Sequence, residues 1–291
     1  MKNKQVIFIT GTSYSGSTLL DMILSNDKNG FSLGEVNAFF RPYRKHHIEQ
    51  IKIEQKKESI LYKTLLNGEK NLYKTIFESD SKIKFIVDSS KDVFWINNQI
   101  DNLNKQGIDY KVVLIYKTPE DLANSFYKRK IFNNWQNHFS KFYKKLFYYN
   151  YDLIFVKSDE IISNNSSLEN LCDDLNIPYF LDKKDYWNTS HNTLFGNNRA
   201  RVAIKGLDII GKERIKDLSS KKGEKEIKLD KNITKEILNQ IKNQINSNRV
   251  IELIRNDLSQ KTQTVKYNSF QISILKASYK LKRIIFRLFK K

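Results

Sequence analysis

Four short and nearly continuous apolar runs constrain the fold of this 291-residue chain more than any other feature. The runs cover residues 5–10, 83–88, 110–116 and 152–157. Because they are apolar at successive positions, they predict strands buried on both faces, as in a parallel sheet. Helical patterns cover roughly 16–26, 91–106, 119–131, 134–149 and 163–175, with further helices within 45–79 and 231–256. The alternation predicts an α/β fold in which a parallel β-sheet is flanked by helices.

Composition narrows the class of protein. Apolar residues make up 40% of the chain, which excludes a disordered protein, and the single cysteine, Cys172, excludes an intramolecular disulfide framework. Lys and Arg number 51 against 32 Asp and Glu, a formal net charge of +19. That excess predicts an anionic partner, either a nucleotide, a nucleic acid, a membrane or another polyanion, unless it reflects only a general bias toward lysine.

The N-terminus has the basic start of a secretory signal but not its apolar segment. Lys2 and Lys4 precede only four apolar residues, 6–9, and a polar segment ends this run. No run approaches the 18 or so apolar residues of a membrane-spanning helix. We therefore expect a cytoplasmic protein.

A phosphate-loop spacing follows the first predicted strand. Residues 11–18 read GTSYSGST and lead directly into an apolar helix, which is the G-x-x-x-x-G-K-[ST] spacing with Ser17 in the place of the lysine. Backbone N–H groups of such a turn converge on an anion, and the helix dipole adds positive potential. Without the lysine, the loop lacks the cation that reaches the β- and γ-phosphates of a triphosphate. An ordinary small-residue turn between strand and helix is the alternative.

The segment Ser15-Gly16-Ser17-Thr18-Leu19 resembles the donor loop of the sulfotransferases that use 3′-phosphoadenosine 5′-phosphosulfate (PAPS). The resemblance implies their phosphate-loop, nucleotide-kinase-like fold, with PAPS as the sulfuryl donor and no metal. This chain departs from many members at Tyr14, where they carry an arginine. The candidate donor-binding residues of the loop are Ser13, Tyr14, Ser15, Gly16, Ser17 and Thr18.

Two further stretches extend the resemblance. In the family, an arginine at a strand end and a serine eight residues later hold the 3′-phosphate of the donor. Here Lys117 and Ser125 have that spacing, with Lys keeping the charge but losing the bidentate fork of Arg. The stretch 191–201 resembles a late G-N-x-x-R element, which implies a lid with Arg199 or Arg201 on a phosphate. The alternatives are a solvated lysine, a surface serine and a turn with surface arginines.

Two residues are candidates for catalysis of sulfuryl transfer. Glu35 resembles the base of the carbohydrate- and tyrosyl-protein-type members, and its alternative is an exposed acid in a loop after the first helix. Lys91 follows the predicted strand 83–88, at the edge where α/β folds bind ligands, and could stabilise charge or orient the acceptor.

A small-molecule kinase that uses Mg·ATP is a competing hypothesis. In that case residues 85–88 would form a Walker B strand, with Asp88 on the magnesium ion. The same segment serves both hypotheses. For the sulfotransferase, the acceptor would be a hydroxyl of a saccharide, which we favour, or of a lipid-linked sugar or peptide.

The C-terminal part carries its own charge pattern. Residues 261–291 contain nine basic residues and no acidic residue, and an apolar stripe at helical spacing runs through them. The sequence thus predicts an α/β domain over 1–258 and a basic amphipathic helix or tail over 259–291. The tail would either dock on the core through its stripe or bind an anionic membrane surface through 272–291. A non-enzymatic module binding membrane or nucleic acid is the third hypothesis, with nucleic acid the least favoured partner.

Overall fold

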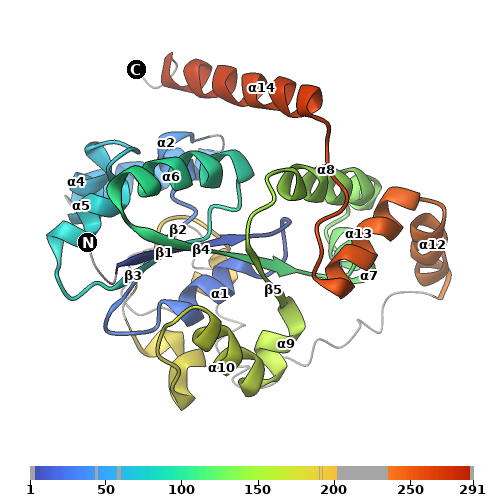
Figure 1. Ribbon diagram of the computed structural model, residues 1–291, viewed down its shortest axis with the longest axis horizontal. Helices are drawn as coiled ribbons and strands as arrows, with labels where there is room; N and C mark the ends of the chain where they lie inside the picture. Colours follow the sequence, from blue (N-terminus) through green and yellow to red (C-terminus); the bar gives the residue numbers. More distant parts are fainter. Residues whose placement is uncertain are drawn as a thin grey trace.

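A five-stranded β-sheet forms the centre of the protein (Figure 1). The computed structural model describes residues 4–42, 45–57, 60–189, 191, 193–201 and 235–288. All pairings are parallel, and the strand order is β2-β3-β1-β4-β5. The strands are β1 (Gln5–Thr10), β2 (Gly30–Gly34), β3 (Phe85–Asp88), β4 (Asp109–Tyr116) and β5 (Leu153–Lys157). This arrangement confirms the predicted α/β fold with a parallel sheet.

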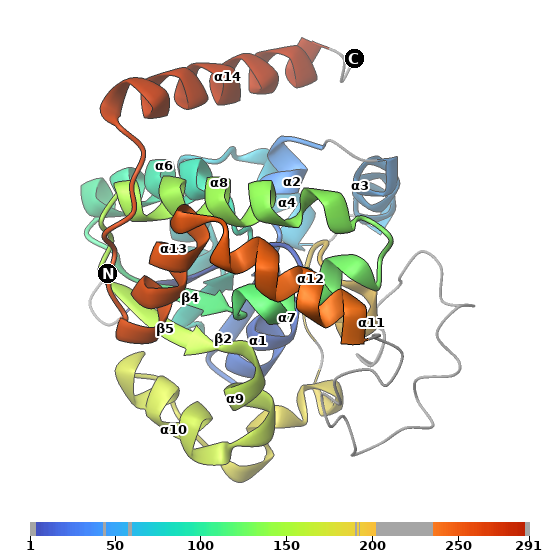
Figure 2. The same ribbon diagram turned by 90° about the vertical axis from the view of Figure 1, so that its right-hand side faces the viewer.

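Helices cover both faces of the sheet, with α1, α9 and α10 on one face and α5, α6 and α8 on the other (Figures 1 and 2). The α-helices are α1 (Ser17–Leu24), α2 (Asn37–Phe40), α3 (Lys45–Lys57), α4 (Ile60–Leu66), α5 (Leu72–Ser79), α6 (Val93–Gln106), α7 (Pro119–Tyr127), α8 (Trp135–Tyr148), α9 (Ser158–Ser163), α10 (Asn165–Asp174), α11 (Asn198–Arg201), α12 (Lys235–Asn246), α13 (Arg249–Gln260) and α14 (Ser269–Leu288). Short 3₁₀ turns cover Phe132–Asn134, Leu181–Lys184 and Tyr186–Asn188.

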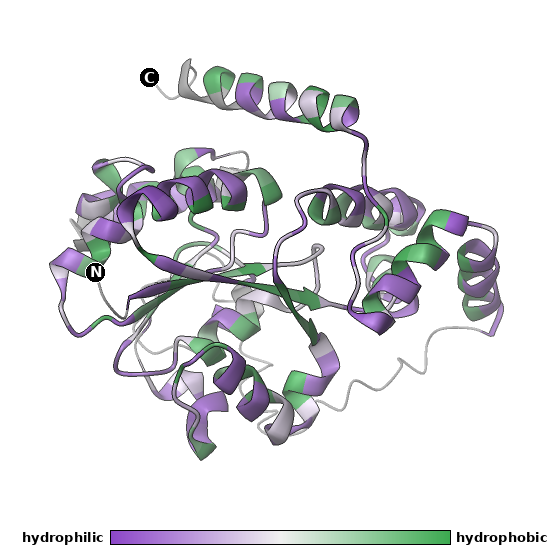
Figure 3. Cartoon of the chain, in the orientation of Figure 1, coloured by the Kyte–Doolittle hydropathy of each residue, from purple (hydrophilic) through white to green (hydrophobic). Residues whose placement is uncertain are grey.

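The alternation of side chains along each strand explains the two cores. In β1, Val6 and Phe8 are buried with α5, α6 and α8, whereas Ile7 and Ile9 are buried with α1, α9 and α10. Successive residues of a strand point to opposite faces, so a strand covered on both sides must be apolar throughout. In Figure 3 the central parts of the strands are green, whereas the helices around them are green and purple in turn. Strand β1 is central, which places the loop that follows it in the middle of the carboxyl edge of the sheet.

The structure corrects the sequence-based prediction at β2. The apolar runs predict four strands and none between the first helix and Glu35, but residues Gly30–Gly34 form an edge strand beside β3. The predicted helix over 119–131 ends at Tyr127, and the predicted helical region 231–256 is two helices, α12 and α13. The segment 204–230, predicted as an irregular excursion, lies outside the described residues.

Helix α14 lies over the outer side of the helical layer that contains α6 and α8 (Figures 1 and 2). It contacts this layer through the ring of Tyr279, 5.1 Å from that of Phe94 in α6, and Ile272 on the same side of the helix is 1% exposed. Of the two alternatives for this helix, docking through the apolar stripe does not agree with the structure, because Ile274 and Leu281 of that stripe are exposed. Among the described residues, no helix is both long enough and apolar enough to cross a lipid bilayer.

Candidate functional site at the carboxyl edge of the sheet

The loop between β1 and α1 is a tight turn with glycine at two positions that need it. Gly16 precedes α1 with a φ of 96°, a left-handed conformation that favours glycine. Gly11 lies so close to β4 that a Cβ there would come within 2.4 Å of the carbonyl oxygen of Ile115. The hydroxyls of Thr12 and Ser15 are buried and have no hydrogen-bond partner among the described residues. Buried hydroxyls are normally satisfied, so these two are available for a ligand in the loop.

A second segment closes over the loop from a distant part of the sequence. The backbone N–H of Asn197 donates to the hydroxyl of Thr18 at 3.0 Å, and a Cβ on Gly196 would lie 2.9 Å from that hydroxyl. Leu194 forms a parallel bridge with Gly34 at the end of β2. The late segment, predicted as a lid, thus packs against the N-terminus of α1 and against the end of the edge strand.

The two arginines proposed for the lid have different outcomes. Arg201 is buried, 3% exposed, and its Nη2 donates to the carbonyl oxygen of Thr193 at 3.3 Å. Burial lowers the pKa of this guanidinium to about 10, against the opposing influence of Glu54 and Glu35. Its Nε has no hydrogen-bond partner among the described residues. The side chain of Arg199 lies outside the described part of the structure, so its predicted role stays a prediction.

Tyr14 occupies the position at which the family resemblance expects an arginine. The guanidinium of a different arginine, Arg129, packs on its ring. The guanidinium of Arg129 lies 4.0 Å from the centroid of the Tyr14 ring, and Phe126 contacts the same ring edge-on at 5.5 Å. Arg129 lies in the turn that follows α7, four residues after Ser125. Its place within the predicted helix 119–131, at that spacing from Ser125, was a signal that could have identified it.

His138 is a second residue that the sequence analysis did not assign to the loop. Its Nε2 accepts a hydrogen bond from the backbone N–H of Ser13 at 3.2 Å. Burial, and secondarily Lys145, lowers the pKa of His138, which favours the neutral ring that can accept this bond. The N–H of Ser13 is therefore already used to hold the loop, which leaves its side-chain hydroxyl for the predicted donor contact.

The predicted 3′-phosphate pair is assembled at the end of the neighbouring strand. The Nζ of Lys117 donates to the hydroxyl oxygen of Ser125 at 3.1 Å. Thr118 lies between them in sequence and caps the N-terminus of α7, because its hydroxyl accepts a hydrogen bond from the N–H of Asp121 at 3.2 Å. Burial lowers the pKa of Lys117, with Asp121 opposing this shift. Strands β1 and β4 are hydrogen-bonded neighbours, so this pair and the loop lie at adjacent strand ends.

The two candidate catalytic residues contact each other. The Nζ of Lys91 donates to a carboxylate oxygen of Glu35, in an ion pair whose side chains are 20% and 17% exposed. Glu35 follows β2, and its N–H donates to the carbonyl oxygen of Leu194 at 2.8 Å. Lys91 has a φ of 61°, an uncommon conformation for a residue with a side chain. Glu35 is thus a partly buried, paired carboxylate at the carboxyl edge and not an exposed loop acid.

Asp88, the candidate magnesium ligand of the kinase hypothesis, is committed to the core. It is fully buried and accepts hydrogen bonds from the hydroxyl of Tyr73 at 2.6 Å and from the indole N–H of Trp95 at 2.8 Å. The N–H of Ser90 donates to its other oxygen at 2.8 Å. Burial raises the pKa of Asp88. A magnesium ion would have to displace these donors to reach the carboxylate.

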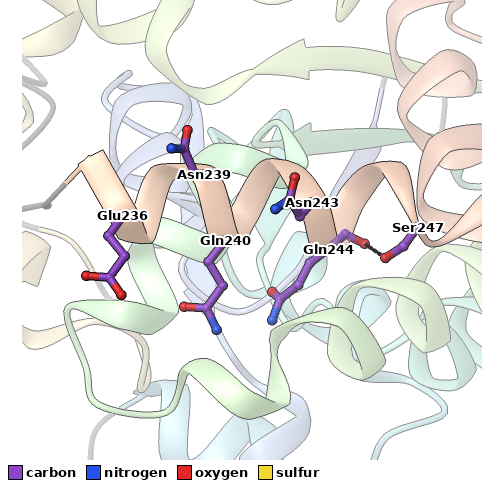
Figure 4. Close-up of a pocket in the computed structure, with 6 residues that line it drawn as sticks. All are labelled: Glu236, Asn239, Gln240, Asn243, Gln244 and Ser247. Atoms are coloured by element: carbon purple, nitrogen blue, oxygen red, sulfur yellow. Dashed lines mark hydrogen bonds between the residues drawn. The ribbon is translucent and has the colours of Figure 1, made fainter.

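A shallow pocket along α12 does not suit an anion (Figure 4). Its lining comes from α12 and the turn that follows it, and consists of Glu236, Asn239, Gln240, Asn243, Gln244 and Ser247. The lining contains one carboxylate and no cation, and Gln244 already accepts from the indole of Trp135 at 2.8 Å. Among the described residues, no cluster of three or more His, Cys, Asp or Glu could hold a metal ion.

Comparisons with known proteins give similarity in structure only. No protein-family model and no curated protein matches the chain in sequence. A sulfotransferase domain of the Synechococcus PCC 7002 olefin synthase is similar at 14% identity and a TM-score of 0.43, over 63% of this chain and 77% of that one. A sulfotransferase domain of the curacin biosynthetic pathway is similar at 14% identity and a TM-score of 0.48, over 84% of this chain and 98% of that one.

A third similar structure comes from a different class of protein. A structure of the PezAT chromosomal toxin–antitoxin system of Streptococcus pneumoniae matches at 14% identity and a TM-score of 0.30, over 65% of this chain and 84% of that one. At these identities and TM-scores, none of the three matches assigns an activity or a donor to this chain.

Proposed function

We propose that this protein is a sulfotransferase that moves a sulfuryl group from PAPS to a hydroxyl group of an acceptor. The observation that carries the proposal is that two elements suited to an anion lie at adjacent strand ends. One is the lysine-free loop 11–18, and the other is the Lys117–Ser125 pair. A donor with one phosphate on each side of its ribose needs two such elements, whereas the triphosphate of ATP needs the missing loop lysine.

The loop would hold the 5′-phosphosulfate end of the donor. Its free hydroxyls at Thr12 and Ser15 and the N-terminus of α1 supply donors and positive potential to an anion. The ammonium of Lys117 and the hydroxyl of Ser125 would hold the 3′-phosphate. Arg129 adds a second cation at the junction between the two elements, because it stacks on Tyr14 and its Nη1 donates to the carbonyl oxygen of Ser125 at 2.7 Å.

The Glu35–Lys91 ion pair would supply the chemistry. In the transfer, the bond between the sulfur and the 5′-phosphate oxygen breaks as a bond to the acceptor oxygen forms. Glu35 takes the proton of the acceptor hydroxyl, and adenosine 3′,5′-bisphosphate leaves. As Glu35 is protonated it loses its charge, which frees the ammonium of Lys91 to stabilise the negative charge that develops on the leaving group.

The Glu35–Lys91 pair fits a hydroxyl acceptor, and the preference for a saccharide rests on the resemblance of Glu35 to the base of carbohydrate-type sulfotransferases. A general base beside a cation suits a hydroxyl nucleophile, and we favour a saccharide hydroxyl over a lipid-linked sugar or a peptide. The kinase alternative receives no support from the site, because the buried Asp88 already accepts hydrogen bonds from Tyr73, Trp95 and Ser90.

The experiment is a donor test with two nucleotides. The protein is incubated with PAPS or with Mg·ATP and a panel of mono- and oligosaccharides, and release of adenosine 3′,5′-bisphosphate or ADP is measured. We expect acceptor-dependent release of the bisphosphate, and its loss in Lys117→Ala, while Lys105→Ala at the exposed C-terminal end of α6 serves as the matched control. Release of ADP alone would overturn the proposal.

A further inference from the structure

The outward face of α14 is apolar. Phe270, Ile274, Leu281, Ile284 and Ile285 are 72%, 53%, 58%, 55% and 41% exposed. At about 100° per residue, these positions and the exposed Ala277 fall within one arc of about 100°. Helices of globular proteins normally bury such a stripe against the core. Here the arc, which we call the outer apolar arc (residues 270, 274, 277, 281, 284 and 285), faces away from the protein.

The opposite side of the helix is the one that contacts the protein. Ile272 and Tyr279 are 1% and 9% exposed, and they lie about 180° from the centre of the outer apolar arc. The guanidinium of Arg41 lies 4.4 Å from the centroid of the Tyr279 ring, and the Nζ of Lys276 lies 5.2 Å from that of Tyr149. These contacts hold the side of the helix with Ile272 and Tyr279 against the protein. The outer apolar arc, on the opposite side, is therefore exposed.

Positive charge borders the outer apolar arc on both sides. Lys280 and Lys282 are exposed and fall about 40° and about 60° beyond opposite edges of the arc. Residues 261–291 contain nine basic residues and no acidic residue, so this segment has no carboxylate that could neutralise its own cations. An apolar arc flanked by lysines matches the boundary between acyl chains and anionic headgroups.

We propose that α14 binds an anionic lipid surface, with the outer apolar arc inserted at the headgroup boundary and the flanking lysines on the headgroups. The opposite helix face stays on the α6–α8 layer, so the protein is held against the surface without a spanning segment. A second copy of the chain is less suited to this surface, because pairing two such helices would bring their lysines together without counter-charges. The proposal concerns a surface separate from the nucleotide site and does not depend on the proposed activity.

The test is flotation of the full-length protein with vesicles of two compositions. One set is pure phosphatidylcholine and the other contains about 30% phosphatidylglycerol, both at 0.15 M salt, where surface charges are screened beyond about 8 Å. We expect the protein to float with the anionic vesicles and to stay unbound with the neutral ones. Absence of flotation with the anionic vesicles would overturn the proposal.

Variants separate insertion of the arc from adsorption by charge. Leu281→Ser combined with Ile285→Ser should reduce the bound fraction at least tenfold, and Lys280→Gln combined with Lys282→Gln should do so as well. Lys84→Gln combined with Lys105→Gln, two exposed lysines outside α14, is the matched control and should bind as the wild type does. Unchanged binding of the Leu281/Ile285 variant would contradict insertion of the arc. Insertion would also be contradicted if the wild type formed a dimer without lipid, detected by sedimentation, and the Leu281/Ile285 variant did not. Because the replaced side chains are exposed, melting curves should be unchanged.

Discussion

The ammonium of Lys117 lies 3.1 Å from the hydroxyl oxygen of Ser125, one residue ending a strand and the other lying in the helix that follows. Because the Ser125 hydroxyl donates to the carbonyl oxygen of Asp121 at 2.9 Å, it accepts from Lys117. The lysine is thereby held in one position before any ligand arrives. A phosphate at this place would meet a fixed cation, which lowers the entropy cost of binding. The Ser125 hydroxyl would donate to the phosphate by turning its proton away from the carbonyl oxygen of Asp121.

The first prediction uses the lowered pKa of Lys117. Burial lowers it from 10.5, and only the charged ammonium below that pKa attracts a phosphate. The affinity for adenosine 3′,5′-bisphosphate should therefore hold near neutral pH and fall as the pH rises through the lowered pKa. In Lys117→Arg the guanidinium stays charged, so the affinity should persist at alkaline pH. Calorimetric titration from pH 7 to 10 measures this, with Lys105→Arg as the control. If the affinity of Lys117→Arg for the bisphosphate fell at alkaline pH as much as that of the wild type, Lys117 would not be the group that binds the phosphate.

The second prediction separates binding from chemistry at Glu35. In Glu35→Gln the nucleotide-binding elements are untouched, so affinity for adenosine 3′,5′-bisphosphate should stay within about twofold of the wild type. Turnover should fall about 10²- to 10⁴-fold, the usual contribution of a general base. The matched control is Glu169→Gln, on the exposed side of α10. Turnover equal to that of the wild type would remove Glu35 as the base.

The third prediction concerns the close approach of the late segment to α1. Gly196 has a φ of 96°, and a Cβ there would lie 2.9 Å from the hydroxyl of Thr18. Gly68 has a φ of 88° with open space around it, so Gly68→Ala tests the conformational cost alone. Gly196→Ala should lower both the melting temperature and nucleotide affinity, because it displaces Asn197 from Thr18, whereas Gly68→Ala should lower only the melting temperature. Equal nucleotide affinity in the two variants would show that the segment does not support the loop.

The fourth prediction is a pH dependence of stability from a buried carboxyl. Burial raises the pKa of Asp21 from its ordinary 3.8 to about 7, although Ser89 and Ser32 donate to it. Between about pH 4 and pH 7 the folded state therefore keeps a proton on Asp21 that the unfolded state releases. The free energy of unfolding is highest below about pH 4 and falls as the pH rises to about 7. The difference corresponds to roughly 4 kcal/mol. Denaturant titrations should show that Asp21→Asn flattens this pH dependence. If the free energy of unfolding of Asp21→Asn changed between pH 4 and 7 as steeply as that of the wild type, the raised pKa of Asp21 would be contradicted.

The sequence predicts those parts of the fold that depend on local pattern. Strands β1, β3, β4 and β5 are apolar at nearly every position because both faces are covered, so they are visible as runs. The pairing of Lys117 with Ser125 was predicted from the family resemblance, and it could be placed because a strand end and the helix that follows it are adjacent in sequence. Strand β2 is different. It reads GFSLG, with a glycine at each end, and it becomes a strand only because β3 supplies its pairing partner.

Contacts between distant segments could not be predicted for the same reason. Glu35 and Lys91 are 56 residues apart, and they meet because β2 and β3 are parallel neighbours whose carboxyl ends share an edge. Without β2 this juxtaposition could not be derived. Periodicity likewise identifies the apolar stripe of α14 but not the direction it faces. That direction is set by the tertiary contact between Tyr279 and Phe94.

The most direct measurement is thermal unfolding with adenosine 3′,5′-bisphosphate, adenosine 5′-phosphate or Mg·ATP. At one hundred times its Kd, a ligand stabilises the folded state by about 2.7 kcal/mol. This corresponds to an increase in Tm of about 5 to 10 °C for a domain of this size. We predict such an increase with the bisphosphate, a smaller one with the monophosphate that lacks the 3′-phosphate, and equal responses to the two nucleotides in Lys117→Ala. Stabilisation by Mg·ATP alone, or a bisphosphate response unaffected by Lys117→Ala, would contradict the proposed function.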